Sequence, residues 1–137
     1  MINYDLAGNL NTPPETLARL ANDMDATVRW RVAENPNTPT ETLNRLVNDG
    51  DWGVRHGVAW NPNTSPKTLD LLANDEDYRV RLNVAWNSNT PPEILERLAN
   101  DGEYWVHYHV IKNPNTPQYI KDYLKIKNYL SSTDTVS

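Results

Sequence analysis

The chain has 137 residues, of which 38% are hydrophobic and none is cysteine, and its formal net charge is -5 at pH 7. This length fits one domain, and without thiols no disulfide framework, thiolate metal centre or iron–sulfur cluster can form. The acidic balance argues against a protein that binds nucleic acid through a generally basic surface. The N-terminus lacks the basic and apolar regions of a secretory signal, and no segment reaches the roughly 20 apolar residues of a membrane span. The sequence therefore predicts a cytoplasmic protein that has no membrane segment.

A gap-free period of 26 residues organises nearly the whole chain. Its most regular phrase, Asn35-Pro36-Asn37-Thr38-Pro39, returns at 61, 87 and 113 and in a diverged form at 9. Self-similarity at a fixed period is the sequence signature of a solenoid, so we predict one repeat domain over residues 1–130. The predicted parts are an N-terminal half repeat (1–6), four full repeats (7–32, 33–58, 59–84 and 85–110), a C-terminal cap (111–130) and a flexible tail (131–137).

Each repeat is predicted to form two short helices. The first follows the Thr of the repeated phrase, which is expected to cap the helix while the next residue, usually Pro, takes the first helical position. The second begins near Asp25 and its equivalents and buries two valines and an alanine in most copies. Helices of about two turns are unstable alone, so stacking must hold them. The predicted fold is thus an all-α solenoid of short helix pairs. The predicted capping boxes are Thr12/Glu15, Thr38/Glu41 and Thr90/Glu93.

A longer helix is predicted over residues 116–130, at the end of the stack. Its apolar and aromatic residues are expected to face the stack and its lysines to face outward. The residues expected to face the stack are Tyr119, Ile120, Tyr123, Leu124 and Tyr129, and those expected to face outward are Lys121, Lys125 and Lys127.

Two sets of polar residues recur in every copy, which favours structural roles. The acidic pairs, such as Asp49/Asp51, resemble acid–base or hard-cation sites. However, the second residue of each pair is placed to cap a helix and to form an ion pair with the residue four positions later. The paired asparagines, such as Asn35 and Asn37, are expected to form turns, because Asn tolerates left-handed backbone and bonds its own chain.

The sequence contains no recognisable signature of catalysis or of a bound cofactor. His107 and His109 are two residues apart and point to different sides of a helix, which is poor for zinc chelation. No Ser or Thr has a recurring His and carboxylate nearby, and no glycine-rich phosphate loop is present. We therefore predict a protein that is not an enzyme and holds no metal and no cofactor.

The repeated phrases together resemble the leucine-rich repeat variant family. The matching elements are Asn-Pro-Asn-Thr-Pro, then Glu-Thr-Leu-x-x-Leu-Ala-x-Asp, then Val-Arg-x-x-Val-Ala. The resemblance implies alternating α-helix and 3₁₀-helix in a right-handed superhelix without sheet. It also implies that members can carry a cysteine-bound iron–sulfur module, which this chain cannot hold. It implies a fold and almost no function.

Four positions on the second helix change from repeat to repeat, while the buried positions agree. A repeated frame with one variable face is typical of a binding solenoid, and Trp, Tyr and Arg dominate interface energetics. Tyr4 and Asp5 extend this strip, whose centre is expected in repeats three and four, with Arg79 beside Trp105. Trp52, Tyr78 and Tyr104 are expected to belong to the frame. The residues predicted to contact a partner are Trp30, Arg31, His56, Trp60, Arg79, Asn83, Trp86, Trp105, Tyr108, His109 and Lys112.

The leading functional prediction is a non-catalytic scaffold that binds a protein or peptide partner through this strip. Nucleic-acid or nucleotide binding is the alternative, because arginine, histidine and lysine alternate there with aromatic residues that could stack on bases. A small-molecule site and self-assembly of stacked ends are weaker alternatives, so a monomer or weak self-association is expected. The sequence leaves open whether Trp60 and Trp86 contact a partner or pack on each other.

Overall fold

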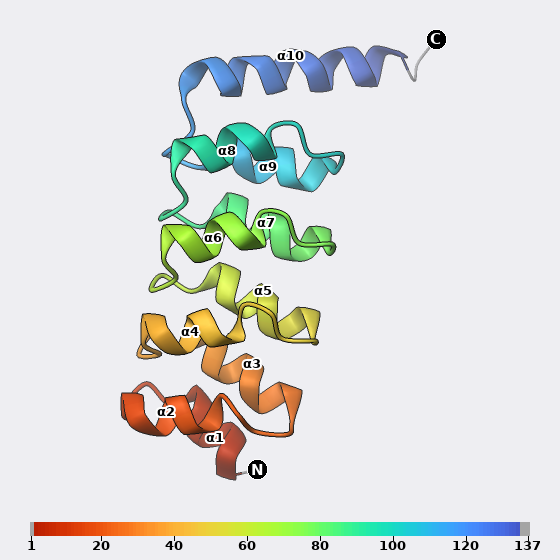
Figure 1. Cartoon of the computed structure of the whole chain (residues 1–137). Coiled ribbons are helices and arrows are strands. Elements are labelled where there is room, and N and C mark those ends of the chain that lie inside the picture. Colours follow the sequence, from red (N-terminus) through yellow and green to blue (C-terminus); the bar gives the residue numbers. More distant parts are fainter. Residues whose placement is uncertain (1, 135–137) are drawn as a thin grey trace.

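The computed structural model describes residues 2–134, with side chains for residues 2–131, and forms ten α-helices and no strand over that range. The helices stack in one direction along the chain, and each repeat adds one layer (Figure 1). This arrangement confirms the predicted all-α solenoid. In chain order the helices are α1 (Ile2–Gly8), α2 (Pro14–Leu20), α3 (Ala26–Glu34), α4 (Thr40–Leu46), α5 (Trp52–Trp60), α6 (Pro66–Leu72), α7 (Tyr78–Trp86), α8 (Pro92–Leu98), α9 (Tyr104–Lys112) and α10 (Gln118–Asp134).

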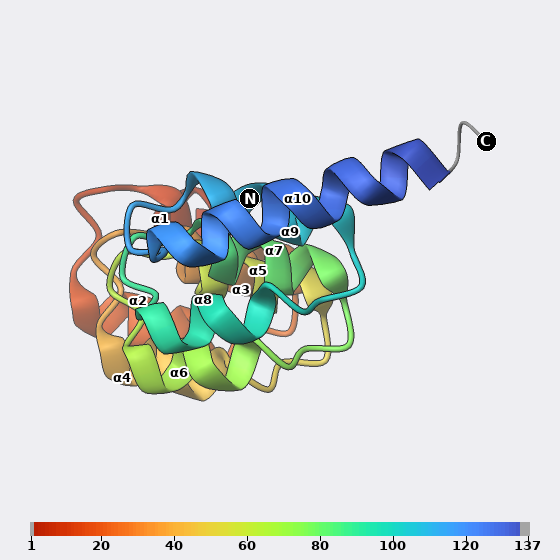
Figure 2. The same cartoon turned by 90° about the horizontal axis from the view of Figure 1, so that it is seen from above.

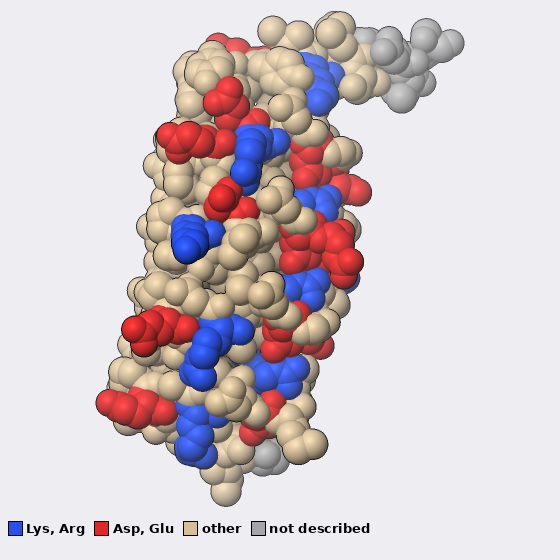
Figure 3. Space-filling view, viewed as in Figure 1, with Lys and Arg blue, Asp and Glu red and all other residues tan. Residues whose placement is uncertain are grey.

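The two helices of each repeat form two parallel columns. Helices α2, α4, α6 and α8, of seven residues, line one side, and α3, α5, α7 and α9, of nine residues, line the other (Figure 2). Both helices are α-helical, and no 3₁₀-helix of the kind implied by the family resemblance occurs within residues 2–134. Figure 3 looks onto the seven-residue helices and shows positive and negative side chains intermixed along the stack.

The core is a continuous apolar column between the two rows of helices. Val54, Val58 and Ala59 on α5 and Leu69 and Leu72 on α6 are buried, and the equivalent residues of the other repeats repeat this pattern. Full burial of one Val or Leu side chain contributes roughly 1.5–3 kcal/mol. Because each short helix buries only one stripe, the free energy of folding comes from contacts between neighbouring repeats.

One buried asparagine per repeat joins each layer to the layer before it. Asn61, which no solvent reaches, donates its side-chain amide to the carbonyls of Ala33 (2.7 Å) and Asn35 (2.9 Å). Those carbonyls lie at the C-terminal end of α3, where a helix leaves its last carbonyls without internal partners. The Asn61 carbonyl oxygen of the side chain accepts the backbone N–H of Asn63 at 2.8 Å. Asn35, Asn87 and Asn113 make the same bonds in the other layers.

The asparagines bond their own backbone, as predicted, but they need no left-handed conformation. Among the described residues, none has a positive φ, and Asn61 itself has φ -68° and ψ 131°. The prediction of left-handed turns is therefore wrong. The Asn61 side chain holds this turn through its bonds to the preceding repeat. These bonds cannot be inferred from the sequence of one repeat.

The repeated threonine is buried and closes a turn through its hydroxyl; it is not the N-cap of α2, α4, α6 or α8. The Thr38 hydroxyl donates to the Val32 carbonyl at 2.6 Å, closing the turn that leaves α3, and its four equivalents do the same. The N-cap of α4 is Pro39, which makes no side-chain cap bond, so the capping boxes predicted at Thr12, Thr38 and Thr90 are wrong. Ser65 is the N-cap of α6 and accepts the Thr68 N–H at 3.3 Å.

The recurring arginine reaches the next repeat and does not pair within its own helix. Arg55 binds both carboxylate oxygens of Asp75, at 2.7 and 3.2 Å, and donates to the Asp49 carbonyl at 2.8 Å. The prediction of a pair with the aspartate four residues earlier is therefore wrong. That aspartate, Asp51, caps α5 as predicted, through the Gly53 N–H at 2.7 Å. Arg29–Asp49 and Arg81–Asp101 repeat the bridge.

The bridges from Arg29, Arg55 and Arg81 to the next repeat form an arginine ladder. The N-terminal half repeat and the fourth repeat have a different residue at the arginine position. In the N-terminal half repeat, Asn3 donates its amide to Asp23 at 2.9 Å. In the fourth repeat, the His107 ring bonds the Asp101 carbonyl at 2.5 Å, and Lys127 stands where the next acidic partner would be. The ladder therefore spans the four full repeats and stops at the cap.

The terminal helix α10 continues to Asp134, so residues 131–134, predicted as tail, are helical; residues 135–137 lie outside the described residues. Ile120 and Leu124 are buried against the stack, as predicted. Tyr119, Tyr123 and Tyr129 are exposed, which contradicts the prediction that they face the stack. Only the first part of α10 covers the last repeat, because the helix extends past the edge of the stack (Figure 2).

The bonds from the Asn61 side chain to the preceding repeat predict a specific loss of stability in Asn61→Ala. The substitution leaves the Ala33 and Asn35 carbonyls and the Asn63 N–H without side-chain partners, and an unsatisfied buried polar group costs about 1–3 kcal/mol. We expect the free energy of unfolding to fall by roughly 2–4 kcal/mol in urea denaturation followed by far-UV circular dichroism. Asn48→Ala, at an exposed position, is the control and should change stability by less than about 0.5 kcal/mol. Equal stability of the two variants would contradict the role assigned to Asn61.

A missing side chain at residue 57 sets the close approach of α5 to α3. A Cβ atom placed on Gly57 would lie 2.9 Å from the Ala33 Cβ and 3.3 Å from the Glu34 Cγ. Ala33 is buried and its Cβ is fixed to the backbone, so the two helices would have to separate. The glycine therefore shapes the junction between the first two full repeats.

We expect Gly57→Val to destabilise the protein by about 2 kcal/mol, because overpacking forces α3 and α5 apart and valine gains little helix propensity. Gly50→Val is the control, since a Cβ at Gly50 meets no atom within 4 Å. Urea denaturation measures both variants, and a Gly57→Val protein as stable as the control would show that no close contact constrains this junction.

Candidate binding surface

Large aromatic side chains remain exposed along the column of nine-residue helices. The exposed fraction is 39% for Trp52, 38% for Trp60, 47% for Trp86, 54% for Trp105 and 40% for Tyr108. The first position of the second helix, expected to belong to the frame, is exposed in three copies, at Trp52, Tyr78 and Tyr104. This position opens outward while the valines behind it fill the core, so its side chains are accessible as well as packed against their neighbours.

Trp60 and Trp86 stack on each other across the junction of α5 and α7. Their ring centroids are 6.0 Å apart and their planes differ by 5°. Each keeps well over a third of its surface exposed. The pair is thus both an inter-repeat contact and an accessible aromatic platform.

The aromatic residues of α9 form a second cluster. Trp105 meets Tyr104 and Tyr108 edge to face, at centroid distances of 5.3 and 5.9 Å. His109 lies 5.3 Å from the Tyr108 ring, and the Lys112 ammonium lies 5.6 Å from the same ring. This cluster contains four of the predicted contact residues.

Arg79 lies over the Trp52 ring of the preceding repeat. Its guanidinium carbon is 3.5 Å from the Trp52 ring centroid, and its Nη2 forms an ion pair with Asp77 at 2.8 Å. The hydrogen bond from this guanidinium, with that from the Arg79 N–H, lowers the pKa of the Asp77 carboxyl to about 2. Trp52 was not among the residues predicted to contact a partner. An aromatic residue about one repeat before an arginine was a usable signal for this contact.

Two other predicted residues are engaged within the protein. The Arg31 guanidinium carbon lies 4.4 Å from the Tyr4 ring and 5.4 Å from the Trp30 ring, so Arg31 packs on both aromatic residues. The Nε atom of Arg31 is buried and has no hydrogen-bond partner among the described residues. Asn83 is buried and donates to the His56 carbonyl at 3.1 Å, so we correct its predicted contact role to a structural one.

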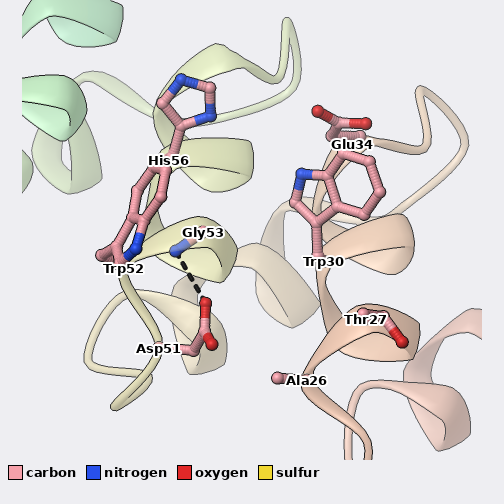
Figure 4. A pocket seen from close by; sticks show the side chains of 8 residues that line it. All are labelled: Ala26, Thr27, Trp30, Glu34, Asp51, Trp52, Gly53 and His56. Atoms are coloured by element: carbon pink, nitrogen blue, oxygen red, sulfur yellow. Dashed lines mark hydrogen bonds between the residues drawn. The ribbon is translucent and has the colours of Figure 1, made fainter.

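A groove of about 320 Å³ lies between α3 and α5, outside the two repeats where the centre was expected. Figure 4 shows Trp30 and Glu34 on the α3 side and Trp52 and His56 on the α5 side. Asp51 lies at one end, held by its bond to the Gly53 N–H. The residues that line the groove are Ala26, Thr27, Trp30, Glu34, Asp51, Trp52, Gly53 and His56.

The surface is less basic than the sequence indicates. Burial, followed by the nearby Arg79 charge, lowers the pKa of His56, and burial lowers the pKa of His109, so the charged form of both rings is disfavoured. Burial raises the pKa of Glu34, against a hydrogen bond from Trp30 and the charge of Arg31. Arg79 is paired with Asp77. Among the residues predicted to contact a partner, Lys112 is therefore the most accessible positively charged one.

Two other kinds of feature are absent from the part of the chain that the structure describes. No group of three or more His, Cys, Asp or Glu side chains is arranged to hold a metal ion in that range. No helix within it is long and apolar enough to cross a membrane.

The second helix, the turn and the first helix of the next repeat match a known pattern. Residues 78–103, which include α7 and α8, match the family model described as leucine rich repeat variant. This repeat is a leucine rich repeat variant. The resemblance predicted from the sequence is thereby confirmed, and the matched segment is one period of 26 residues. None of the curated proteins compared with the chain matches it. The match identifies a helical repeat scaffold.

The contact between Arg79 and Asp77 predicts a pKa that can be measured. In Arg79→Gln, the pKa of the Asp77 carboxyl should rise from about 2 toward its ordinary value of 3.8, because the ionised form loses its charged donor but keeps the Arg79-position N–H bond. Carboxyl-detected NMR titration measures this value. The pair's contribution to stability is present above pH 4 and is lost as the pH falls toward 2.

Arg97→Gln is the matched control, since Arg97 pairs with Asp70 on another helix and should leave the Asp77 pKa unchanged. An unaltered Asp77 pKa in Arg79→Gln would contradict the assigned ion pair.

Proposed function

We propose that this chain is a non-catalytic scaffold that binds a peptide segment of a protein partner along the face formed by α3, α5, α7 and α9. The observation that carries the proposal is the row of exposed Trp and Tyr side chains on a frame whose recurring polar groups are satisfied internally. Contiguous exposed aromatic surface marks interaction sites, and Trp and Tyr are the residues most enriched at binding hot spots.

The charge state of the face favours a peptide over nucleic acid. Binding to phosphates requires free cations, and each neutralised phosphate adds to a steep salt dependence. Here Arg79 is paired with Asp77, Arg31 lies against the Tyr4 and Trp30 rings, and burial lowers the pKa of both His56 and His109, which disfavours their charged forms. Few cations therefore remain for a phosphate backbone.

The double variant Trp86→Ala/Trp105→Ala tests the proposal. Peptides selected from a displayed random library on the wild-type protein should bind the variant at least about thirtyfold more weakly, since hot-spot residues contribute 2 kcal/mol or more. Isothermal titration calorimetry measures the affinities. Helicity should be retained, with a stability loss of about 0.5–1.5 kcal/mol from the broken Trp60–Trp86 stack.

Glu15→Ala/Glu41→Ala, on exposed positions of the seven-residue helices, is the control and should bind with wild-type affinity. Equal binding by the aromatic double variant, or loss of its helical structure, counts against the proposal. Binding of single-stranded oligonucleotides that weakens steeply between low and physiological salt would favour nucleic acid as the partner instead.

A further inference from the structure

The groove between α3 and α5 combines two indole rings with carboxylates. Trp30 and Trp52 come from opposite sides of it, Glu34 lies beside Trp30, and Asp51 lies at the base (Figure 4). The residues that line it include no Lys and no Arg, and burial lowers the pKa of the lining His56 below its ordinary value. At neutral pH the groove is therefore aromatic and negatively charged.

Glu34 is the unusual member of this set. It occupies the position held by Trp60, Trp86 and Lys112 in later repeats, so the groove at this junction has a carboxylate that the other junctions lack. Glu34 is half-buried and forms no ion pair within the described residues, although Arg31 lies close enough to influence its charge. A partly desolvated carboxylate without an ion-pair partner is a favourable receptor for a cation.

The Trp52 ring already binds a cation within the chain. The Arg79 guanidinium carbon lies 3.5 Å from its centroid, which is well inside the range of a cation–π contact. Arg79 is not among the residues that line the groove, so it does not fill the space between Trp52 and Trp30. Aromatic rings arranged around a cation are a recognised way to bind ammonium and guanidinium groups.

We propose that this groove holds one basic side chain, arginine or lysine, of the bound peptide. The inference rests on the proposed function and specifies its partner, which carries a positive charge where it crosses α3 and α5. The groove volume of about 320 Å³ lies at the small end of ligand pockets, which suits one long side chain. An anionic group would meet Glu34 and Asp51 as like charges, and an apolar group would leave the Glu34 carboxylate partly desolvated without an ion-pair partner.

Short peptides with one variable residue test the site directly. Each probe is Gly-Ser-Gly-X-Gly-Ser-Gly with blocked ends, where X is Arg, Lys, Leu or Glu. The readout is the NMR shift of the indole N–H resonances of the five tryptophans in the full chain. With Arg or Lys, the Trp30 and Trp52 resonances should shift saturably and the Trp86 resonance should not. Saturable shifts of equal affinity with Leu or Glu, or no saturable shift with Arg and Lys, would overturn the proposal.

Two variants identify the groups responsible. Glu34→Gln keeps the shape of the side chain and removes its charge, and Trp52→Leu keeps an apolar residue and removes the ring. Each should weaken the Arg probe at least about tenfold, the change expected for loss of a charge-assisted or cation–π contact. Tyr119→Leu, which alters an exposed aromatic residue of α10 outside the proposed binding face, is the matched control and should leave this affinity unchanged. Circular dichroism establishes that all three variants are folded, and an Arg affinity unaffected by Glu34→Gln would refute the role of the carboxylate.

The peptides selected on the wild type separate this inference from the proposed function. Selected peptides that carry a conserved Arg or Lys and bind Glu34→Gln at least about tenfold more weakly support it. Selected peptides that depend on Trp86 and Trp105 but contain no required basic residue would overturn the groove assignment and leave the binding function standing. Failure to select any peptide, with no saturable shift by the Arg probe, would overturn both.

Discussion

The bond from each buried asparagine to two carbonyls of the preceding repeat is the interaction on which the rest of the structure depends. Asn61 satisfies the Ala33 carbonyl, near the end of α3 where a helix leaves its last carbonyls unpaired, and it gives the Asn35 carbonyl a second donor beside the Thr38 N–H. One layer thus completes the helix of the layer before it. No helix pair can satisfy its own backbone alone, which is why the chain folds as a stack and why the period of 26 residues does not vary.

The arginine bridges act on the opposite edge of each layer. Arg55 binds Asp75 of the next repeat and the Asp49 carbonyl of its own turn, so the turns between helices are fixed to each other as the asparagines fix the helix ends. Because both edges are held in this way, the outward positions of α3, α5, α7 and α9 share no structural role that requires the same residue in every repeat. Their side chains therefore differ between repeats and provide the face on which Trp86 and Trp105 are exposed.

Most of the fold was predictable, and the errors have a common origin. The period, the helix pairs and the Asp51 cap follow from residues close together in the sequence. Thr38 was predicted as a cap because its sequence neighbours allow it, yet its hydroxyl binds a carbonyl six residues back. Arg55 was predicted to pair within its helix, yet Asp75 lies nearer in space. In the candidate surface, Trp52 and the groove were missed because helix stacking brings together residues that are far apart in the sequence, such as Trp30 and Trp52.

The sequence by itself determined that this chain is a helical solenoid, that one of its repeats matches the leucine rich repeat variant model, and which valines and leucines form the core, because each of these properties recurs with the period. Only the tertiary structure decided the partners of the polar residues, the stacking of Trp60 on Trp86, the pairing of Arg79 with Asp77 and the burial that lowers the pKa of His56. It also decided that Glu34 and Trp52 face one groove. The physical reason is that side chains of consecutive repeats meet across a layer spacing set by packing, and the charge and exposure of each depend on what it meets there.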